Sequence, residues 1–298
     1  MLDEIKEKML YQIFMDVDDF CLELGKFLQG RCLSTQTAKR YMPQCLMSES
    51  EIVALLIFYH YSGYKCFQYY YENLVQRDLR SFFPALVSYN RFIELIPRCF
   101  LSTYLFTQFC CLRAKREGIY FSDSKKLPVC HNKRIHSHRV FQDIARRGKT
   151  STGWFYGLKL HLVVNRFGEV VQFLITAGNV ADNAKAVLDK LFKDLKGKCF
   201  GDKGYLTRFF EYFYEKGLQI ITRLRTNMKN KLMDISDSLL LRKRALIESI
   251  NDILMTVFDI DHSRHRSAKN AIVHLLAGLS AYAYYPQKPT VFIPNALV

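Results

Sequence analysis

Residues 118–124 read GIYFSDS, a short β-rich run with an acidic residue near its end, and four similar runs follow along the chain. They read WFYGLKLHLVVN (154–165), EVVQFLIT (169–176), KCFGD (198–202) and LQIITRL (218–224). Several alternate apolar with polar residues between Gly, Asn or Asp turns, as strands do. Helical sequence lies at 179–197 and 207–217. We therefore predict an α/β fold with a mixed sheet flanked by helices, antiparallel first and parallel later.

The sequence before residue 115 has a helical pattern instead. Ser48 and Glu51 have capping-box spacing ahead of the apolar run IVALLIFY (52–59), which predicts the start of a helix. Shorter helical runs follow at 65–75 and 88–96, on either side of a break at Pro84. Three short helices with tight joints resemble a helix-turn-helix module, in which Tyr89, Asn90 and Arg91 would read bases, but an ordinary helical cap has the same pattern. We expect a helical N-terminal region at 1–115, the α/β domain at 116–285 and a tail at 286–298.

The chain carries 43 Lys and Arg against 28 Asp and Glu, a formal net charge of +15. Such a surplus favours a polyanionic partner, either nucleic acid or an anionic membrane face. The apolar stretches at 52–59 and 271–285 are too short or too interrupted to span a bilayer, and the first ten residues do not read as a secretory signal. We expect no membrane partner and a cytoplasmic, nucleoid-associated location.

Acidic residues at strand ends are notable in so basic a chain, because carboxylates repel a polyanion unless metal ions lie between them. Asp123 ends the first predicted strand and Asp202 ends the fourth, and the two would converge if those strands are neighbours. Glu248 follows on a long helix predicted over about 236–258. Carboxylate oxygens suit Mg²⁺, and a pair of such ions is common in phosphodiester chemistry. Each acid taken alone also has an ordinary structural interpretation. Asp123 and Asp202 would each form a turn or cap a helix. Glu248 would lie on a solvated helix face, in a helical ion pair with Arg244.

Several blocks together resemble the DDE transposases of bacterial insertion sequences, with insertion sequence nine-eighty-two as the nearest group. They are SDSKKLPVCHNKRIHSHR (122–139), GWFYGLKLHLVVN (153–165), ITAGNVADN (175–183), GDKGY (201–205), NMKNK (227–231), LLLRKRALIESIND (239–252), HSRHRS (262–267) and HLLAGLSAYAY (274–284). The resemblance implies a ribonuclease-H-like core whose Asp-Asp-Glu triad falls on Asp123, Asp202 and Glu248. Arg244 matches the family's helix pattern, whereas Leu241 and Met255 stand where relatives carry Tyr and Lys.

Basic residues are expected to bind DNA phosphates around this site. The block that follows the first strand directly, 131–149, would flank the metal ions. A zinc site at Cys130, His131, His136 and His138 is not expected there, since the spacing matches no familiar module. The full set of expected DNA contacts comprises Lys133, Arg134, Arg139, Arg146, Arg147, Lys149, Lys203, Arg223, Arg225, Lys229, Lys231, Arg244, Arg264 and Arg266.

The resulting hypothesis is a transposase that binds the ends of its element and cuts and joins double-stranded DNA with two Mg²⁺ ions, Mn²⁺ serving as a substitute. One ion would lie between Asp123 and Asp202 and the other between Asp123 and Glu248. Because two ends must be brought together, we expect a homodimer or larger assembly on DNA. Two alternatives stay open: a DNA-binding protein that no longer cuts, and a stand-alone nuclease of the same fold.

Overall fold

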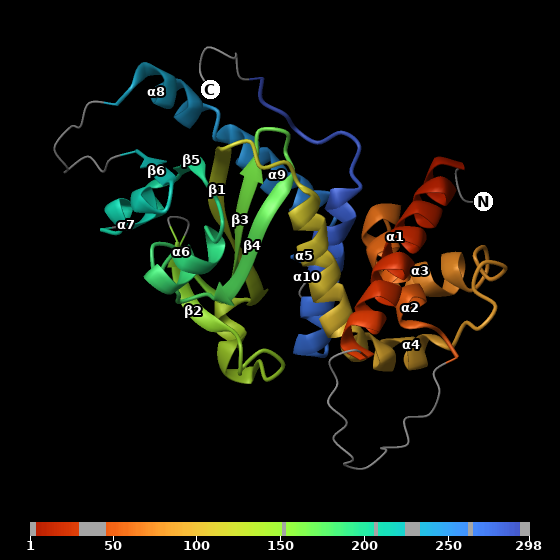
Figure 1. The fold of residues 1–298 in the computed structure, drawn as a ribbon. Coiled ribbons are helices and arrows are strands. Elements are labelled where there is room, and N and C mark those ends of the chain that lie inside the picture. The colour runs from red at the N-terminus through yellow and green to blue at the C-terminus, as the bar shows by residue number, and fades with distance from the viewer. Residues whose placement is uncertain are drawn as a thin grey trace. The chain divides into compact units, whose positions relative to one another are not determined.

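The computed structural model of the chain describes residues 4–29, 46–150, 153–205, 208–223, 233–261 and 265–292. The chain divides into two units (Figure 1). The first comprises Met1–Thr107, Val257–Ile260 and Lys269–Tyr285, and the second Gln108–Thr256, Asp261–Ala268 and Pro286–Val298. This differs from the expected boundaries, because residues 269–285 group with the N-terminal helices and not with the sheet.

The first unit is helical, as predicted. Its elements are α1 (Glu4–Gln29), α2 (Glu49–Ser62), α3 (Phe67–Tyr70), the π-helix η1 (Tyr71–Val75), α4 (Tyr89–Leu95), the 3₁₀ turn η2 (Ile96–Cys99), most of α5 (Phe100–Arg113) and most of α10 (Ala268–Ala283). The predicted capping box is confirmed: the Glu51 amide donates to Ser48 Oγ at 3.1 Å, and the Ser48 amide donates to Glu51 Oε2 at 2.7 Å. Both bonds satisfy amides that the first helical turn leaves without partners.

The helical run from Tyr89 to Arg113 was not among the apolar stretches considered as membrane spans from the sequence. By length and composition alone it is long and apolar enough to cross a bilayer, and 44% of its most apolar window is buried inside the protein. Pro97 lies within its 3₁₀ turn and Arg98 is exposed near its middle. A cation at that depth of a bilayer would be costly, which weighs against a span.

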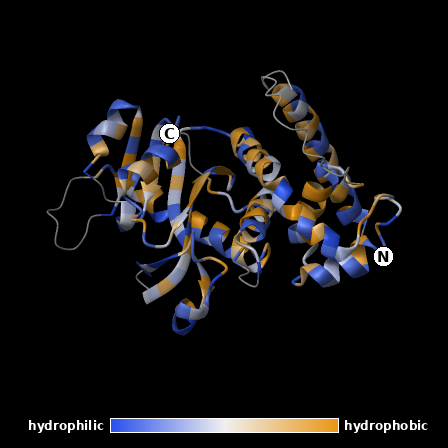
Figure 2. Ribbon diagram, turned by 90° about the horizontal axis from the view of Figure 1, so that it is seen from below, coloured by the Kyte–Doolittle hydropathy of each residue, from blue (hydrophilic) through white to orange (hydrophobic). Residues whose placement is uncertain are grey.

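The second unit is a six-stranded mixed sheet with helices packed against it (Figure 1). Its strands are β1 (Ile119–Cys130), β2 (Arg146–Thr150), β3 (Gly153–Asn165), β4 (Val170–Ala177), β5 (Gly197–Gly201) and β6 (Leu218–Thr222). Its helices and turns are η3 (Asn132–Ser137), α6 (Lys185–Leu191), η4 (Lys203–Tyr205), α7 (Phe210–Glu215), α8 (Ile235–Arg242) and α9 (Ala245–Thr256). Figure 2 shows the same residues coloured by hydropathy, with polar and apolar residues interleaved along the elements.

The strand order confirms the predicted mixed, ribonuclease-H-like sheet. β1 lies at its centre, antiparallel to β3 and parallel to β5, and β6 continues the parallel part. The second edge of β3 is divided between two strands, since β2 pairs with residues 153–157 and β4 with residues 158–164. β2 is an addition to the prediction, which treated its sequence RRGKT only as a basic block.

Apolar side chains from α6 and α7 cover one face of the sheet. Tyr120 of β1, Val163 of β3 and Cys199 of β5 form a core cluster there with Leu188 of α6 and Phe213 of α7. On the other side α9 lies against β1 and buries its apolar stripe, Leu246, Ile247, Ile250 and Leu254. The sheet is therefore held between two helical layers, and α9 brings its polar residues close to Asp123.

The single helix predicted over about 236–258 is wrong, because the structure has α8 and α9 with a break at Lys243 and Arg244. Both Leu241 and Leu246 are buried. On one straight helix they would point about 140° apart, so a single packing surface could not cover both. The break lets each helix bury its own apolar side, and it places Arg244 at the corner.

Candidate active site

Asp123 lies within β1, and the expectation that it ends the strand is wrong. β1 pairs with β5 only from Ile119 to Ser122, but its pairing with β3 continues to Cys130. The long antiparallel partner keeps the backbone extended for seven residues past Asp123. Asp123 is thus fixed in the middle of a strand, at the point where the parallel pairing ends.

Asp202 directly follows β5 and comes next to Asp123 through the strand register. Ser122 and Gly201 are register partners, and an acid follows each of them. A Cβ atom on Gly201 would lie 2.9 Å from Ser122 Oγ, so glycine permits this close approach. After Asp202 the chain turns through η4, closed by a bond from the Tyr205 amide to the Asp202 carbonyl at 2.9 Å.

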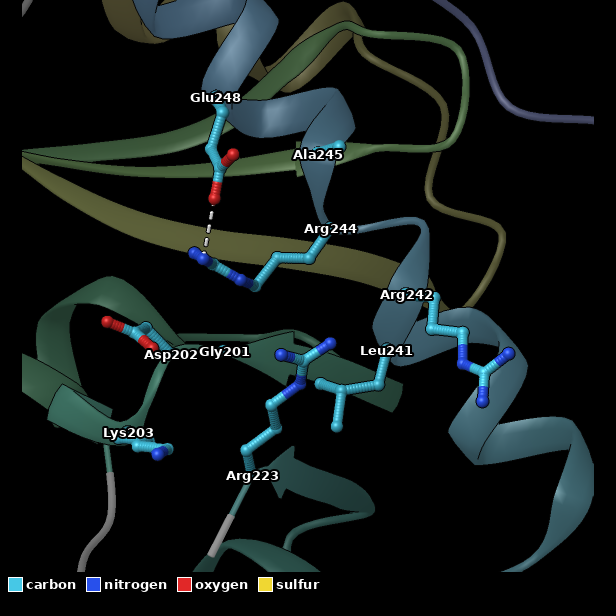
Figure 3. A pocket seen from close by; sticks show the side chains of 9 residues that line it. All are labelled: Gly201, Asp202, Lys203, Arg223, Leu241, Arg242, Arg244, Ala245 and Glu248. Atoms are coloured by element: carbon cyan, nitrogen blue, oxygen red, sulfur yellow. Dashed lines mark hydrogen bonds and ion pairs between the residues drawn. The ribbon is translucent and has the colours of Figure 1, made fainter. Parts of the chain in front are cut away.

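Glu248 lies in the first turn of α9 and shares a pocket of about 250 Å³ with Asp202 (Figure 3). An acidic residue in a first turn is favoured by the positive end of the helix, which is the ordinary structural reason for its presence. The pocket is lined by Gly201, Asp202, Lys203, Arg223, Leu241, Arg242, Arg244, Ala245 and Glu248. Two of the three predicted acids therefore border one cavity, and Leu241, which the resemblance places where relatives carry Tyr, borders it too.

Arg244 bridges two of the acids. Its guanidinium donates to Glu248 Oε1 at 2.6 Å, which is the expected helical ion pair, and lies 3.6 Å from Asp123 Oδ1. In Figure 3 the Arg244 side chain reaches toward Glu248, while Arg242 points away from it. One cation thus sits between carboxylates that come from β1 and α9.

The electrostatics of Asp123 connect all three acids. Burial raises the pKa of Asp123 to about 6; the Arg244 guanidinium lowers it, and the charges of Asp202 and Glu248 raise it further. The Asn251 amide of α9 donates to Asp123 Oδ2 at 2.9 Å. Asn251 is itself buried, and its own Oδ1 has no hydrogen-bond partner among the described residues.

These groups fit a hard divalent cation by their chemistry. Three carboxylates and a buried amide oxygen provide only oxygen donors, which Mg²⁺ and Mn²⁺ favour. The described residues contain no three His, Cys, Asp or Glu side chains close enough together to hold an ion as they stand. Instead, the Arg244 guanidinium offsets part of the negative charge of the site.

Nine of the fourteen expected DNA contacts fall in two separate places. Lys203, Arg223 and Arg244 line the pocket, together with Arg242, which the sequence reading missed. The expectation that block 131–149 flanks the metal site is wrong, because β1 runs on past Asp123 and carries the block to the other end of the sheet (Figure 1). Exposed there are Lys133 and Arg134 on η3, Arg139 after it, and Arg146, Arg147 and Lys149 on β2.

The remaining predicted residues lie elsewhere. Arg266 is exposed shortly before α10. Arg225, Lys229, Lys231 and Arg264 lie outside the residues that the structure describes. Of the residues weighed for zinc, His131 accepts a bond from the Lys133 amide at 3.3 Å and His138 stacks on Phe141.

A buried polar cluster beside the turn after Asp202 was also missed. Lys159 Nζ donates to Asp182 Oδ1 at 3.0 Å and to the Val180 carbonyl at 2.9 Å. Asp182 Oδ2 would lie 3.4 Å from a Cβ atom on Gly204, which places this carboxylate against the turn. Asp182 belongs to the block ITAGNVADN, which the resemblance already marked in the sequence. Only the fold shows that this block lies beside residues 201–205.

Comparison with protein families gives one decisive result. The model of the transposase DDE domain matches residues 113–268, which is more than half of the chain. The chain belongs to the DDE transposase family. The match spans the whole of the site, from Asp123 to Glu248, and domains of this family generally use divalent metal ions. No match was found for this transposase among curated proteins or among solved structures. Its assignment to the nine-eighty-two group stays a prediction.

Proposed function

We propose that this transposase binds the ends of a mobile DNA element, cuts them and joins them to a new site. The observation that carries the proposal is the gathering of acids within the family domain. Asp202 and Glu248 line one pocket, and both lie close enough to Asp123 for their charges to raise its pKa.

In this proposal Asp123, Asp202 and Glu248 hold two Mg²⁺ ions, or Mn²⁺ in their place. When bound, such ions activate the attacking oxygen and stabilise the leaving oxygen of a phosphodiester. Asp123, held by Asn251, would be the ligand common to both ions, because β1 pairs with β5, which Asp202 follows, and also packs against α9, which carries Glu248. Lys203 and Arg223 would hold the phosphates of the strand to be cut, since they line the same pocket.

The helical unit would add recognition of the element's ends. α4 begins at Tyr89 after a cap in which Ser88 Oγ accepts a bond from the Arg91 amide, and Asn90 is exposed. Arg91 forms an ion pair with Glu94 at 2.8 Å, so its contact with DNA would require that pair to open. We also infer a dimer or larger assembly on DNA, and a cytoplasmic, nucleoid-associated location that follows from the substrate.

Cleavage and joining of a DNA end with Mg²⁺, measured for the wild type, Asp202→Asn and Asp252→Asn, test the proposal. Asp252 is the matched control, because it is an exposed acid of α9 that pairs loosely with Lys125 at 3.6 Å. We expect the wild type and Asp252→Asn to cut and join, whereas Asp202→Asn binds the same DNA without cutting it. Equal cutting by Asp202→Asn would refute the assignment of the triad.

The same assay distinguishes the two alternatives. Leu241 lines the pocket at the position where the resemblance implies Tyr, so this difference lies in the site itself. It is the observation that favours a protein that binds DNA but no longer cuts it. Binding without cutting by the wild type would favour that alternative. Cutting without joining of pre-cut ends would favour a nuclease.

A further inference from the structure

The hairpin of β2 and β3 carries a basic surface that the pocket does not explain. Residues 131–157 contain six lysine and arginine residues against a single acid, Asp143, and they also contain Trp154, the only tryptophan of the chain. All six cations are exposed. The surface therefore suits a polyanion, and the exposed tryptophan stands among its charges.

Trp154 is held at the surface of this hairpin. It is 52% exposed, whereas the next two residues, Phe155 and Tyr156, are buried at 4% and 8% exposed. Burial of a side chain of this size would give a large gain in free energy. Because a single exposed apolar residue is ordinary, the groups around the ring decide whether it belongs to a binding site.

Two cations adjoin the indole ring. Trp154 and Lys149 are cross-strand partners, and Lys149 Nζ lies 5.6 Å from the ring centroid. The Arg147 guanidinium lies 4.8 Å from the same centroid. The side-chain amide of Asn132 donates to the Trp154 backbone carbonyl at 2.9 Å, and this bond holds η3, with its Lys133, beside the hairpin. An aromatic ring thus stands among charges that suit phosphates.

We propose that Trp154, with Arg147 and Lys149, forms a stacking site for an unpaired nucleobase of bound DNA. This inference rests on the proposed function, because it requires that the chain bind DNA. Bases stack on exposed aromatic rings whatever their sequence, while neighbouring cations hold the backbone of the same strand. An apolar protein surface is a poorer occupant, since covering the ring would also remove two cations from water.

The site lies apart from the carboxylates. Leu162, the register partner of Asp123, is eight residues from Trp154 along β3. At about 3.3 Å per residue this is about 26 Å. A DNA strand rises about 3.4 Å per nucleotide, so the unpaired base would lie about eight nucleotides from the bond that is cut.

The single tryptophan makes the test direct. The fluorescence of Trp154 is followed while the full-length protein is titrated with a paired duplex and with the same duplex carrying one unpaired base eight nucleotides from the cut. We expect stronger quenching by the second DNA and an affinity about 5- to 150-fold higher, the range that base stacking on an aromatic ring provides.

Variants assign that preference to the ring. Binding of labelled DNA by Trp154→Ala should lose the preference for the unpaired base, and Trp154→Phe should keep part of it. Tyr214→Ala, which removes another exposed aromatic side chain, 69% exposed on α7, is the matched control and should keep it all. Circular dichroism checks that each variant is folded.

The outcomes separate this inference from the proposed function. Equal affinity of the wild type for the two DNAs, or a full preference in Trp154→Ala, overturns the stacking site while duplex binding and cutting stand. Failure to bind either DNA overturns both proposals.

Discussion

The Arg244 guanidinium lies 3.6 Å from the carboxylate of Asp123, although the two residues belong to different elements and are far apart in the sequence. The same guanidinium pairs with Glu248 at 2.6 Å. Arg244 therefore carries the positive charge that a metal ion would bring to these two acids, and a bound metal ion would compete with Arg244 for the same carboxylates.

Replacing Arg244 by Met should raise the affinity of the DNA-free protein for Mn²⁺. We expect about a tenfold increase, because one opposite charge at this distance changes the protonation of a carboxylate by a comparable factor. Titration calorimetry or the electron paramagnetic resonance of free Mn²⁺ measures it. Arg242→Met is the control, since Arg242 lines the same pocket and points away from Glu248. An unchanged affinity in Arg244→Met would show that the two cations do not compete.

Asn251→Leu should slow cleavage without weakening DNA binding. Asn251 is buried and donates to Asp123 Oδ2, and a hydrogen bond to a charged group is worth about 1.5–3 kcal/mol. Loss of this bond frees the Asp123 carboxylate to rotate, and we expect the single-turnover rate to fall by at least about tenfold. Ser249→Ala on the same helix removes only a bond to the Ala245 carbonyl and should cut at the normal rate. Equal rates in all three proteins would remove Asn251 from the site.

The stability of the protein should depend on His161 below neutral pH. Burial lowers the pKa of His161 from its ordinary 6.5 to about 4, against the opposing effect of Asp182. The unfolded chain therefore takes up a proton that the folded chain does not, and the stability present above pH 6.5 is lost as the pH falls toward 4. The loss amounts to roughly 3 kcal/mol for a shift of this size.

Urea unfolding of the wild type and His161→Gln between pH 7 and pH 4.5 isolates that contribution. The variant should show a shallower decline, because Gln does not titrate. His136→Gln, at an exposed position of η3, should follow the wild type. Parallel declines for wild type and His161→Gln would mean that His161 is protonated in the folded protein.

Removing Lys198 should destabilise the sheet unit. Lys198 Nζ donates to Asp237 Oδ1 at 2.6 Å, and Asp237 is only 6% exposed. Lys198→Met leaves a nearly buried carboxylate without its hydrogen-bond donor, at a cost of about 1–3 kcal/mol. Thermal unfolding should show this loss, and the double variant Lys198→Met with Asp237→Leu should recover most of it. If the double variant is no more stable than the single one, the pair has another role.

The strands that sequence alone predicted are those whose pattern is local. The five β-rich runs lie between Gly, Asn or Asp turns and several of them alternate apolar with polar residues, and Ser48 with Glu51 carries a complete helix start within four residues. β2 was not predicted, because its residues Arg146 to Thr150 become a strand only by pairing with β3. The extension of β1 beyond Asp123 has the same cause.

The candidate site likewise combines residues that the sequence predicted with contacts that only the fold creates. The strand ends and the following helix indicated Asp123, Asp202 and Glu248, and the resemblance implies the same three acids. The strand register explains why the first two come together. The bridge from Arg244 to Asp123 depends on a helix break that contains neither Gly nor Pro, so no local signal marks it. Asn251 contacts Asp123 and Asp182 contacts Lys159, and each pair is more than twenty positions apart in the sequence. A pattern of neighbouring residues does not reveal such contacts.

The length of β3 has a further consequence if both proposals hold. The strand is continuous from Trp154 to Leu162, so the interval between the stacking site and the acids cannot be shortened without breaking the sheet. The length of β3 would therefore fix the distance between the two points at which the protein holds the DNA. An element end with fewer than about eight nucleotides beyond the cut could reach only one of the two sites. The minimum size of a usable DNA end would then be set by the backbone of one strand, independently of the bases that are read.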